Sequence, residues 1–225
     1  LADVEQLTLH GRPPSLMVPF VSPGARLMIL SDGADTPAEI ARILIERGYG
    51  DSRIYVLEHM GGPQERGVEG TASAWQHADI APFNTVGVEC VAGPDAVILP
   101  RVPGLPEDAF ISDGNITKRE VRAATLAALA PLPGQHLWDV GAGCGAVAIE
   151  WMRTHPSCRA TAVESRADRI GLIARNAIAL GVPQLGMIEG EATSVLSGLD
   201  APDAVFIGGG ASTPGLLDLC WDALT

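Results

Sequence analysis

The chain has 225 residues, of which 47% are hydrophobic and 19% are charged, and its formal net charge is −12. This apolar content is too high for a disordered chain, no apolar run approaches the ~20 residues that span a bilayer, and the acidic balance argues against binding to nucleic acid. Because the four cysteines (Cys90, Cys144, Cys158 and Cys220) are widely spaced, we expect no metal site and no disulfide framework, and a soluble protein of one or two domains in a reducing cytoplasm.

The first hundred residues predict an α/β arrangement with about three strands. The expected strands are residues 26–32, 53–58 and 84–90. Thr36-Pro37-Ala38-Glu39 has the form of a capping box, with Thr36 as the N-cap of a helix, and Gly48 is a suitable C-cap. The Gly- and Pro-containing stretch 60–67 is predicted to be a loop.

Residues 99–116 contain three prolines and two glycines without a sustained hydrophobic period, so we expect a linker and loop there. Thr117-Lys118-Arg119-Glu120 is a second capping box, which predicts a helix that begins at Thr117. Val121, Ala124 and Ala128 fall on one side of that helix, and this side is expected to be the buried one.

The second half alternates regularly between strands and helices. Strands are predicted at 136–141, 160–164, 186–190 and 203–208, and helices at 146–154, 167–181 and 213–224. This order implies right-handed βαβ units and a parallel sheet with helices on both faces. Open sheets of this kind usually have five or more strands, so we expect the sequence to be a fragment of a longer protein.

A glycine-rich turn carries the first chemical signal. Gly141-Ala142-Gly143-Cys144-Gly145 follows a strand and opens a helix, where glycines permit a tight turn and close approach to a ligand. Glu164 ends the next strand, 164 − 141 = 23 positions after the first glycine. A carboxylate at that place can accept hydrogen bonds from both hydroxyls of a ribose, so the pair indicates a nucleotide-like cofactor.

Three interpretations of this motif compete. A glycine run at a strand–helix turn can be purely structural, and Glu164 can be a solvated strand end. A nicotinamide site would have the spacing G-x-G-x-x-G, whereas the spacing here is G-x-G-x-G. Asp139, two residues before the first glycine, is unusual in a dinucleotide strand and common in methyltransferases. These details favour S-adenosylmethionine.

Further stretches make the assignment more specific. They are residues 105–110, LPEDAF; residues 113–122, DGNITKREVR; residues 137–145, LWDVGAGCG; residues 189–192, EGEA; and residues 208–210, GGG. With these motifs the region 105–210 resembles the family of decarboxylating methyltransferases of cobalamin biosynthesis that act on C15 of precorrin-6. DGNITKREVR is much more specific to that family than the glycine turn.

The first part of the chain resembles a different family. Residues 9–12, LHGR, residues 31–48 and residues 57–72 are similar to the C-terminal lobe of the tetrapyrrole methylases. Both resemblances occur in this order in a family of fused enzymes that methylate C5 and C15 of precorrin-6Y. The implied fold is α/β: a partial tetrapyrrole-methylase lobe followed by a Rossmann-like class I S-adenosylmethionine-dependent methyltransferase domain.

This resemblance implies three regions. Residues 1–98 would be the C-terminal lobe of a tetrapyrrole-methylase-like domain, residues 99–116 a linker and substrate-side loop, and residues 117–225 a C-terminally incomplete class I domain. We expect the N-terminal lobe of the front enzyme to be missing from this sequence. The front cofactor cleft should therefore be incomplete, and the first region alone should not methylate C5.

The resemblance also implies the residues of the site and its partners. The expected cofactor-binding residues are Thr117, Gly141, Ala142, Gly143, Cys144, Gly145, Glu164 and Ala192, although Thr117 could equally be only an N-cap. Lys118, Arg119 and Arg122 are expected to bind carboxylates of a precorrin substrate, because cations cluster there and Arg binds carboxylate in a bidentate way. No residue is assigned to catalysis or to metal, and we expect a homo-oligomer.

Two alternatives remain open. The chain could be a class I methyltransferase for another small molecule or a protein, or it could be a non-catalytic α/β scaffold or interaction module. Gly208-Gly209-Gly210 stands where methyltransferases of amino groups often carry Asn/Asp-Pro-Pro-Tyr. Its presence argues against methylation of an adenine or glutamine nitrogen.

Overall fold

The computed structural model describes residues 3–224, and the chain divides into two compact units, one within residues 1–99 and one within residues 100–225. Each unit has its own β-sheet. From Pro100 onwards the segment expected as a linker belongs to the second unit. No helix among the described residues is long and apolar enough to cross a bilayer.

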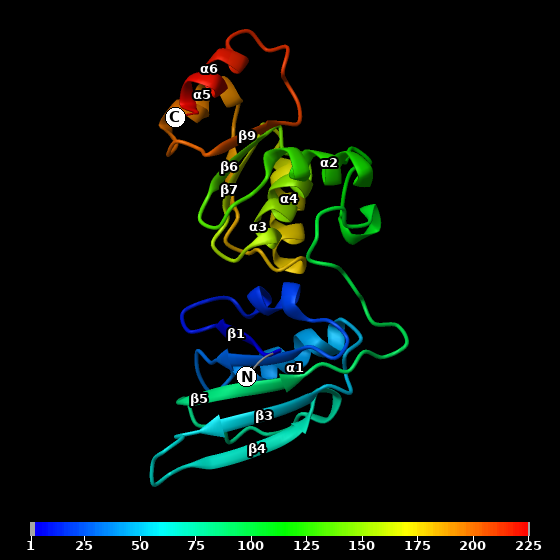
Figure 1. Ribbon diagram of the computed structural model, residues 1–225, viewed down its shortest axis with the longest axis vertical. Coiled ribbons are helices and arrows are strands. Elements are labelled where there is room, and N and C mark those ends of the chain that lie inside the picture. Colours follow the sequence, from blue (N-terminus) through cyan, green and yellow to red (C-terminus); the bar gives the residue numbers. More distant parts are fainter. Residues whose placement is uncertain (1–2, 225) are drawn as a thin grey trace. The chain divides into compact units, whose positions relative to one another are not determined.

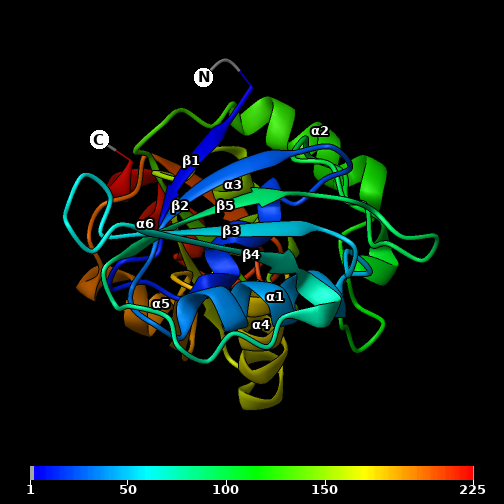
Figure 2. The same ribbon diagram turned by 90° about the horizontal axis from the view of Figure 1, so that it is seen from below.

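The first unit contains a mixed five-stranded sheet of order β1-β2-β5-β3-β4, and Figure 2 shows these strands side by side. The strands are β1 (Glu5–Thr8), β2 (Arg26–Leu30), β5 (Asn84–Glu89), β3 (Arg53–Glu58) and β4 (Arg66–Thr71). β1 pairs with β2 in parallel, and the other pairs are antiparallel.

The expectation of about three strands in this unit is wrong, because β1 and β4 were not anticipated. Both are edge strands, β1 is short, and most of their residues are exposed or only half-buried. β4 has the sequence RGVEGT, whose two glycines and charged residues resemble a loop. Edge strands carry a weak apolar signal because only one neighbour and part of one face bury them.

Helix α1 (Thr36–Glu46) covers the first unit's core together with the 3₁₀ helices η1 (Pro14–Phe20) and η2 (Ala72–Ala74). Thr36 is not the N-cap: its hydroxyl accepts hydrogen bonds from the amides of Asp32 and Gly33, at 3.2 Å each, and so stabilises the preceding turn. Just beyond the helix Gly48 has φ of +79°, the left-handed conformation that favours glycine there.

The second unit contains a four-stranded sheet of order β8-β7-β6-β9 in which every pair is parallel, as predicted. Its strands are β8 (Gly186–Glu189), β7 (Arg159–Glu164), β6 (His136–Val140) and β9 (Ala204–Ile207). The carboxyl ends of these strands therefore meet at one edge of the sheet.

Helices cover both faces of this sheet, which confirms the prediction. In Figure 1, α3 (Ala146–Thr154) and α4 (Ala167–Ala179) lie on one face, and α5 (Ala192–Val195) and α6 (Leu216–Ala223) lie on the other. Side chains of β6 alternate accordingly: Trp138 and Val140 join the core beneath α6, whereas Asp139 points towards α3. Short 3₁₀ helices, η3 (Glu107–Ala109) and η4 (Leu196–Gly198), complete the unit.

Helix α2 (Arg119–Leu129) corrects two expectations. It begins after Thr117, with Lys118 at the N-cap position and no side-chain cap. Its buried residues are Arg122 and Leu126, whereas Val121 is 53% exposed, so the predicted buried side faces solvent. The reason is that α2 packs against α3 through Arg122, which pairs with the buried carboxylate of Glu150. The spacing of apolar residues could not reveal a buried arginine.

Candidate functional site

A pocket of about 530 Å³ lies at the carboxyl edge of the second sheet. Its walls come from the residues that follow all four strands and from the segment before α2. The lining residues include Asn115, Ile116, Thr117, Asp139, Gly141, Ala142, Gly143, Cys144, Glu164, Arg169, Glu191, Ala192, Gly208, Gly209 and Gly210. Its size is typical of pockets for small molecules and cofactors.

The glycine turn lines the pocket, and its backbone lies close to the turn after β9. Gly141 has φ of +69°, and a Cβ atom there would lie 2.8 Å from the amide nitrogen of Gly209. Only glycine permits this approach without displacing backbone. Gly145 has φ of +80° and packs against Ile173 of α4, so it shapes the turn rather than the pocket wall.

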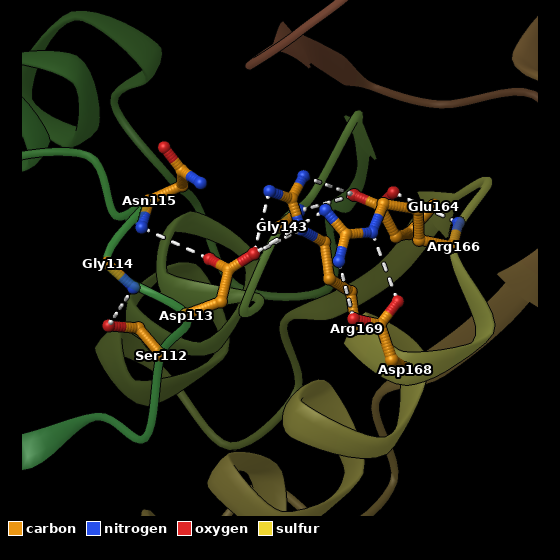
Figure 3. Close-up of polar contacts among 9 residues, drawn as sticks. All are labelled: Ser112, Asp113, Gly114, Asn115, Gly143, Glu164, Arg166, Asp168 and Arg169. Atoms are coloured by element: carbon orange, nitrogen blue, oxygen red, sulfur yellow. Dashed lines mark hydrogen bonds and ion pairs between the residues drawn. The ribbon is translucent and has the colours of Figure 1, made fainter.

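Glu164 lies at the end of β7 with its side chain almost completely buried in the pocket wall (Figure 3). Its Oε2 accepts a hydrogen bond of 2.9 Å from the amide of Gly143, and its Oε1 accepts one of 3.1 Å from the amide of Arg166. The guanidinium of Arg169 lies 3.8 Å from Oε2. The glycine turn and the carboxylate are thus joined directly by a hydrogen bond.

Asp139 is the most unusual group in the pocket. Its Oδ2 accepts a hydrogen bond of 3.0 Å from the amide of Ala148, while its buried Oδ1 has no partner within the described part of the chain. Burial, and to a lesser degree the charge of Glu164, raises the pKa of Asp139 to about 7, against the effect of the Ala148 amide. An unpaired buried oxygen in a pocket wall is suited to accept a hydrogen bond from a ligand.

A second wall is formed by residues 115–117, which precede α2. The guanidinium of Arg122 donates a hydrogen bond to the carbonyl of Thr117 and another to the carbonyl of Leu105. It also donates to Glu150 at 2.8 Å, and both side chains are buried. This buried ion pair therefore fixes the chain where it enters the pocket.

The structure brings most of the predicted cofactor residues together. Those that line the pocket are Thr117, Gly141, Ala142, Gly143, Cys144, Glu164 and Ala192. Gly145 does not line it, because its Cα faces Ile173.

The three cations expected to bind substrate behave differently from one another. Arg122 is completely buried, so the expectation that it binds a substrate carboxylate is wrong: its donors are used by Glu150 and by backbone carbonyls. Lys118 and Arg119 are exposed and lie outside the pocket lining. Nζ of Lys118 is 3.7 Å from Oε1 of Glu107.

Sequence reasoning did not single out Asn115 and Ile116, although it expected residues 99–116 to form a substrate-side loop, and it missed Arg169 as a lining residue. Asn115 and Ile116 belong to the DGNITKREVR motif, which was itself a usable signal. Arg169 had no signal of its own, because a basic residue in the first turn of a helix is common. Among residues 3–224 no cluster of three or more His, Cys, Asp and Glu side chains is arranged to hold a metal ion.

Comparison with known proteins gives a consistent result. A family model described as a precorrin methyltransferase domain matches residues 108–225, more than half of the chain. The chain is 43% identical over 224 residues to a precorrin-6Y C(5,15)-methyltransferase [decarboxylating] of Sinorhizobium sp, covering 100% of this chain and 54% of the relative. It is 42% identical to the protein of the same name in Mycobacterium tuberculosis strain H37Rv, covering 99% of this chain and 55% of the relative.

A solved structure agrees with these relatives. The C-terminal domain of the precorrin-6Y C5,15-methyltransferase of Rhodobacter capsulatus is 46% identical, with a TM-score of 0.53, and the match covers 56% of this chain and 68% of that domain. The chain spans about half the length of the curated relatives named above.

Proposed function

Because this chain belongs to the precorrin methyltransferase family, we propose that its second unit binds S-adenosylmethionine and methylates carbon C15 of a precorrin-6 macrocycle, with loss of carbon dioxide from a ring acetate. The observation that carries the proposal is the pocket itself. A glycine turn, the buried carboxylate of Glu164 and a buried carboxylate oxygen of Asp139 that has no partner among the described residues converge there.

The residues present fit this cofactor. Glu164 would accept the ribose hydroxyls, and the unpaired Oδ1 of Asp139 would receive the ammonium of the methionine end. The backbone of residues 141–144 would approach the cofactor closely. The absence of a side chain at Gly141 already allows this turn to lie against the backbone of Gly209. Thr117 and Ala192, which both line the pocket, would border the cofactor.

When bound, the cofactor supplies a sulfonium methyl group, which is already a strong electrophile. The residues of this chain therefore need to supply no nucleophile. They hold the reacting groups in line and exclude water, and orientation of this kind can account for much of the barrier reduction. The conjugated macrocycle provides the attacking carbon and accepts electrons when the ring acetate loses carbon dioxide.

The turn after β9 favours a bulky substrate. A Cβ atom at Gly209 would have no neighbour closer than 3.9 Å, so the glycine leaves space in the pocket wall. Lys118 and Arg119 remain the proposed partners for substrate carboxylates, because both are exposed at the start of α2, directly after the pocket wall.

For the whole protein we propose the two-step activity that the relatives' names describe. Residues 1–98 would be the C-terminal lobe of a tetrapyrrole-methylase-like module that methylates C5 only when complete. Residues 99–116 would form a substrate-side loop, and residues 117–225 the class I domain. We further propose a homo-oligomer in the cytoplasm, which size-exclusion chromatography with light scattering and cell fractionation would test.

The cofactor proposal is tested by calorimetry with S-adenosylhomocysteine. Replacing Glu164 with Ala should weaken binding by about 1.5–3 kcal/mol, because a charged acceptor of two hydroxyls is lost. Glu189→Ala is the matched control, since Glu189 ends the neighbouring strand β8 but is exposed and does not line the pocket. An equal dissociation constant for Glu164→Ala and wild type would remove Glu164 from the site.

The substrate proposal needs turnover. The full-length protein should release carbon dioxide and methylate precorrin-6Y, with methyl transfer detected by mass spectrometry. Cofactor binding without turnover of any precorrin would favour a methyltransferase for another molecule, and no cofactor binding would favour a scaffold.

A further inference from the structure

The wall segment 112–116 is a short loop held at each end by a buried polar side chain. At one end Asn176, which is 1% exposed, accepts a hydrogen bond of 2.8 Å from the amide of Ile111 and donates one of 2.9 Å to its carbonyl. At the other end Arg122 binds the carbonyl of Thr117. Between these anchors Gly114 has φ of +92°, a conformation that favours glycine.

Within this segment Asp113 makes the contact with the body of the unit. Its Oδ2 accepts hydrogen bonds from Nε and Nη2 of Arg169, at 2.9 and 2.8 Å, and its Oδ1 accepts one of 3.1 Å from the amide of Asn115 (Figure 3). Hydrogen bonding to Arg169, ahead of that to Asn115, lowers the pKa of Asp113. Asp113 itself does not line the pocket, whereas Asn115 does.

Arg169 connects this loop to the buried carboxylate of the site. Its side chain is 19% exposed and lies between Asp113 on one side and Glu164 on the other, with Nη1 3.8 Å from Oε2 of Glu164. That same oxygen accepts the amide of Gly143. A continuous polar chain thus runs from the 112–116 segment through one guanidinium to the glycine turn, as Figure 3 shows.

An ordinary surface ion pair would not have these properties. Exposed pairs contribute little because water screens them and both side chains lose freedom. Here the guanidinium is mostly buried, it faces two carboxylates, and one of these is almost completely buried in a pocket wall. Arg166 is the more exposed neighbour: its side chain is 52% exposed, it pairs with the exposed Asp168, and its Nη1 lies 3.8 Å from Oδ2 of Asp113 without a hydrogen bond between them.

We propose that Asp113 and Arg169 form a latch that positions Glu164 and holds the 112–116 segment against the pocket, so that ligand binding at Glu164 and closure of the segment are linked. The inference rests on the proposed function only in using S-adenosylhomocysteine as the probe. Arg169 borders the ligand, whereas Asp113 is a positioning residue that acts through Arg169.

The test compares Asp113→Asn, Arg169→Gln, Arg169→Lys and the Asp113→Asn/Arg169→Gln double variant in the 225-residue chain. Arg175→Gln is the matched control, because Arg175 lies on the same helix, is exposed and does not line the pocket. Affinity for S-adenosylhomocysteine is measured by calorimetry, and amide exchange of Asn115 and Gly143 is followed by NMR with and without it.

We expect Arg169→Gln to weaken binding about tenfold and Asp113→Asn by about threefold, as for loss of charge-assisted hydrogen bonds. The double variant should bind no more weakly than Arg169→Gln, because both changes break one chain, and Arg169→Lys should recover part of the affinity. The melting temperature should stay near that of Arg175→Gln. Wild-type affinity in Asp113→Asn, or additive losses in the double variant, would overturn the latch.

The exchange measurement separates this inference from the cofactor proposal. If wild type does not bind S-adenosylhomocysteine, the cofactor proposal fails while the latch is still decided in the ligand-free protein. The amides of Asn115 and Gly143 should then exchange faster in Arg169→Gln than in Arg175→Gln, because their acceptors Asp113 and Glu164 are no longer held. Equal exchange rates in the two variants would refute it.

Discussion

Asp139 combines a structural and a chemical role in one side chain. One carboxylate oxygen accepts a hydrogen bond from the amide of Ala148 at the start of α3, and the other is buried without a partner among residues 3–224. Leaving a buried acceptor unmet costs stability unless a ligand supplies the donor. The residue is therefore suited to a site whose ligand carries a cationic or hydrogen-bonding group.

The raised pKa of Asp139 predicts how stability depends on pH. Burial moves the pKa from 3.8 to about 7, so between these values the folded protein binds a proton that the unfolded chain has released. Stability should fall as pH rises through this window, and Asp139→Asn should become progressively more stable relative to wild type. Chemical denaturation of both proteins from pH 4 to pH 8 measures this difference.

Asp168 provides a control, because its contribution to stability should change with pH in the opposite direction. Hydrogen bonding to Arg166 lowers the pKa of Asp168, so its contribution is present above its ordinary pKa and is lost as pH falls through the lowered value. A stability difference between wild type and Asp139→Asn that stays constant across the window would contradict the prediction for Asp139.

At the scale of elements, a buried ion pair joins α2, α3 and the segment before η3. Glu150 of α3 accepts hydrogen bonds from the amides of Gly104 and Leu105, at 2.6 and 3.0 Å, as well as from Arg122 of α2. The ring of Phe110 lies 4.9 Å from the guanidinium carbon of Arg122. The pair thus fixes the path of residues 104–117, which leads into the pocket wall.

Breaking this pair should be strongly destabilising. Arg122→Met leaves the Glu150 carboxylate buried without its cation, and we expect a loss of about 3–5 kcal/mol in the free energy of unfolding by urea. Arg119→Met is the control on the same helix. It is exposed, and a change within about 0.5 kcal/mol is expected there. A similar small change for Arg122→Met would show that the pair does not hold this region.

At the scale of the whole molecule, the two units are built differently. The first has a mixed sheet with a core around α1, and the second has a parallel sheet with helices on both faces. Every residue that lines the pocket lies between Asn115 and Leu216, within the second unit. The pocket is therefore a feature of the described part of the second unit by itself.

This arrangement predicts the outcome of dividing the chain. Residues 100–225 expressed alone should fold and bind S-adenosylhomocysteine within about twofold of the full chain, a difference of about 0.4 kcal/mol. Residues 1–99 alone should not bind it. Calorimetry on the two fragments, with circular dichroism to verify folding, makes the comparison. Loss of binding in a folded 100–225 fragment would mean that the first unit contributes to the site.

The sequence alone determined the parallel sheet of the second unit, the glycine turn and the place of Glu164. These features follow from local patterns. Apolar strands alternate with helices along the sequence, and the carboxyl ends of parallel strands meet at one edge of the sheet. The first unit's edge strands β1 and β4 were not predictable in this way, since partly exposed strands with glycines resemble loops.

Only the tertiary structure decided which charged residues are buried. Arg122 appeared to be a solvent-facing cation of a helix start, yet Glu150, 28 positions away, receives it in the interior. Arg169 had no sequence signal, and its place between Asp113 and Glu164 arises from segments 56 positions apart. The local spacing of apolar and polar residues predicts which face of an element is generally buried. The partner of a buried charge depends instead on which distant segments the fold brings together.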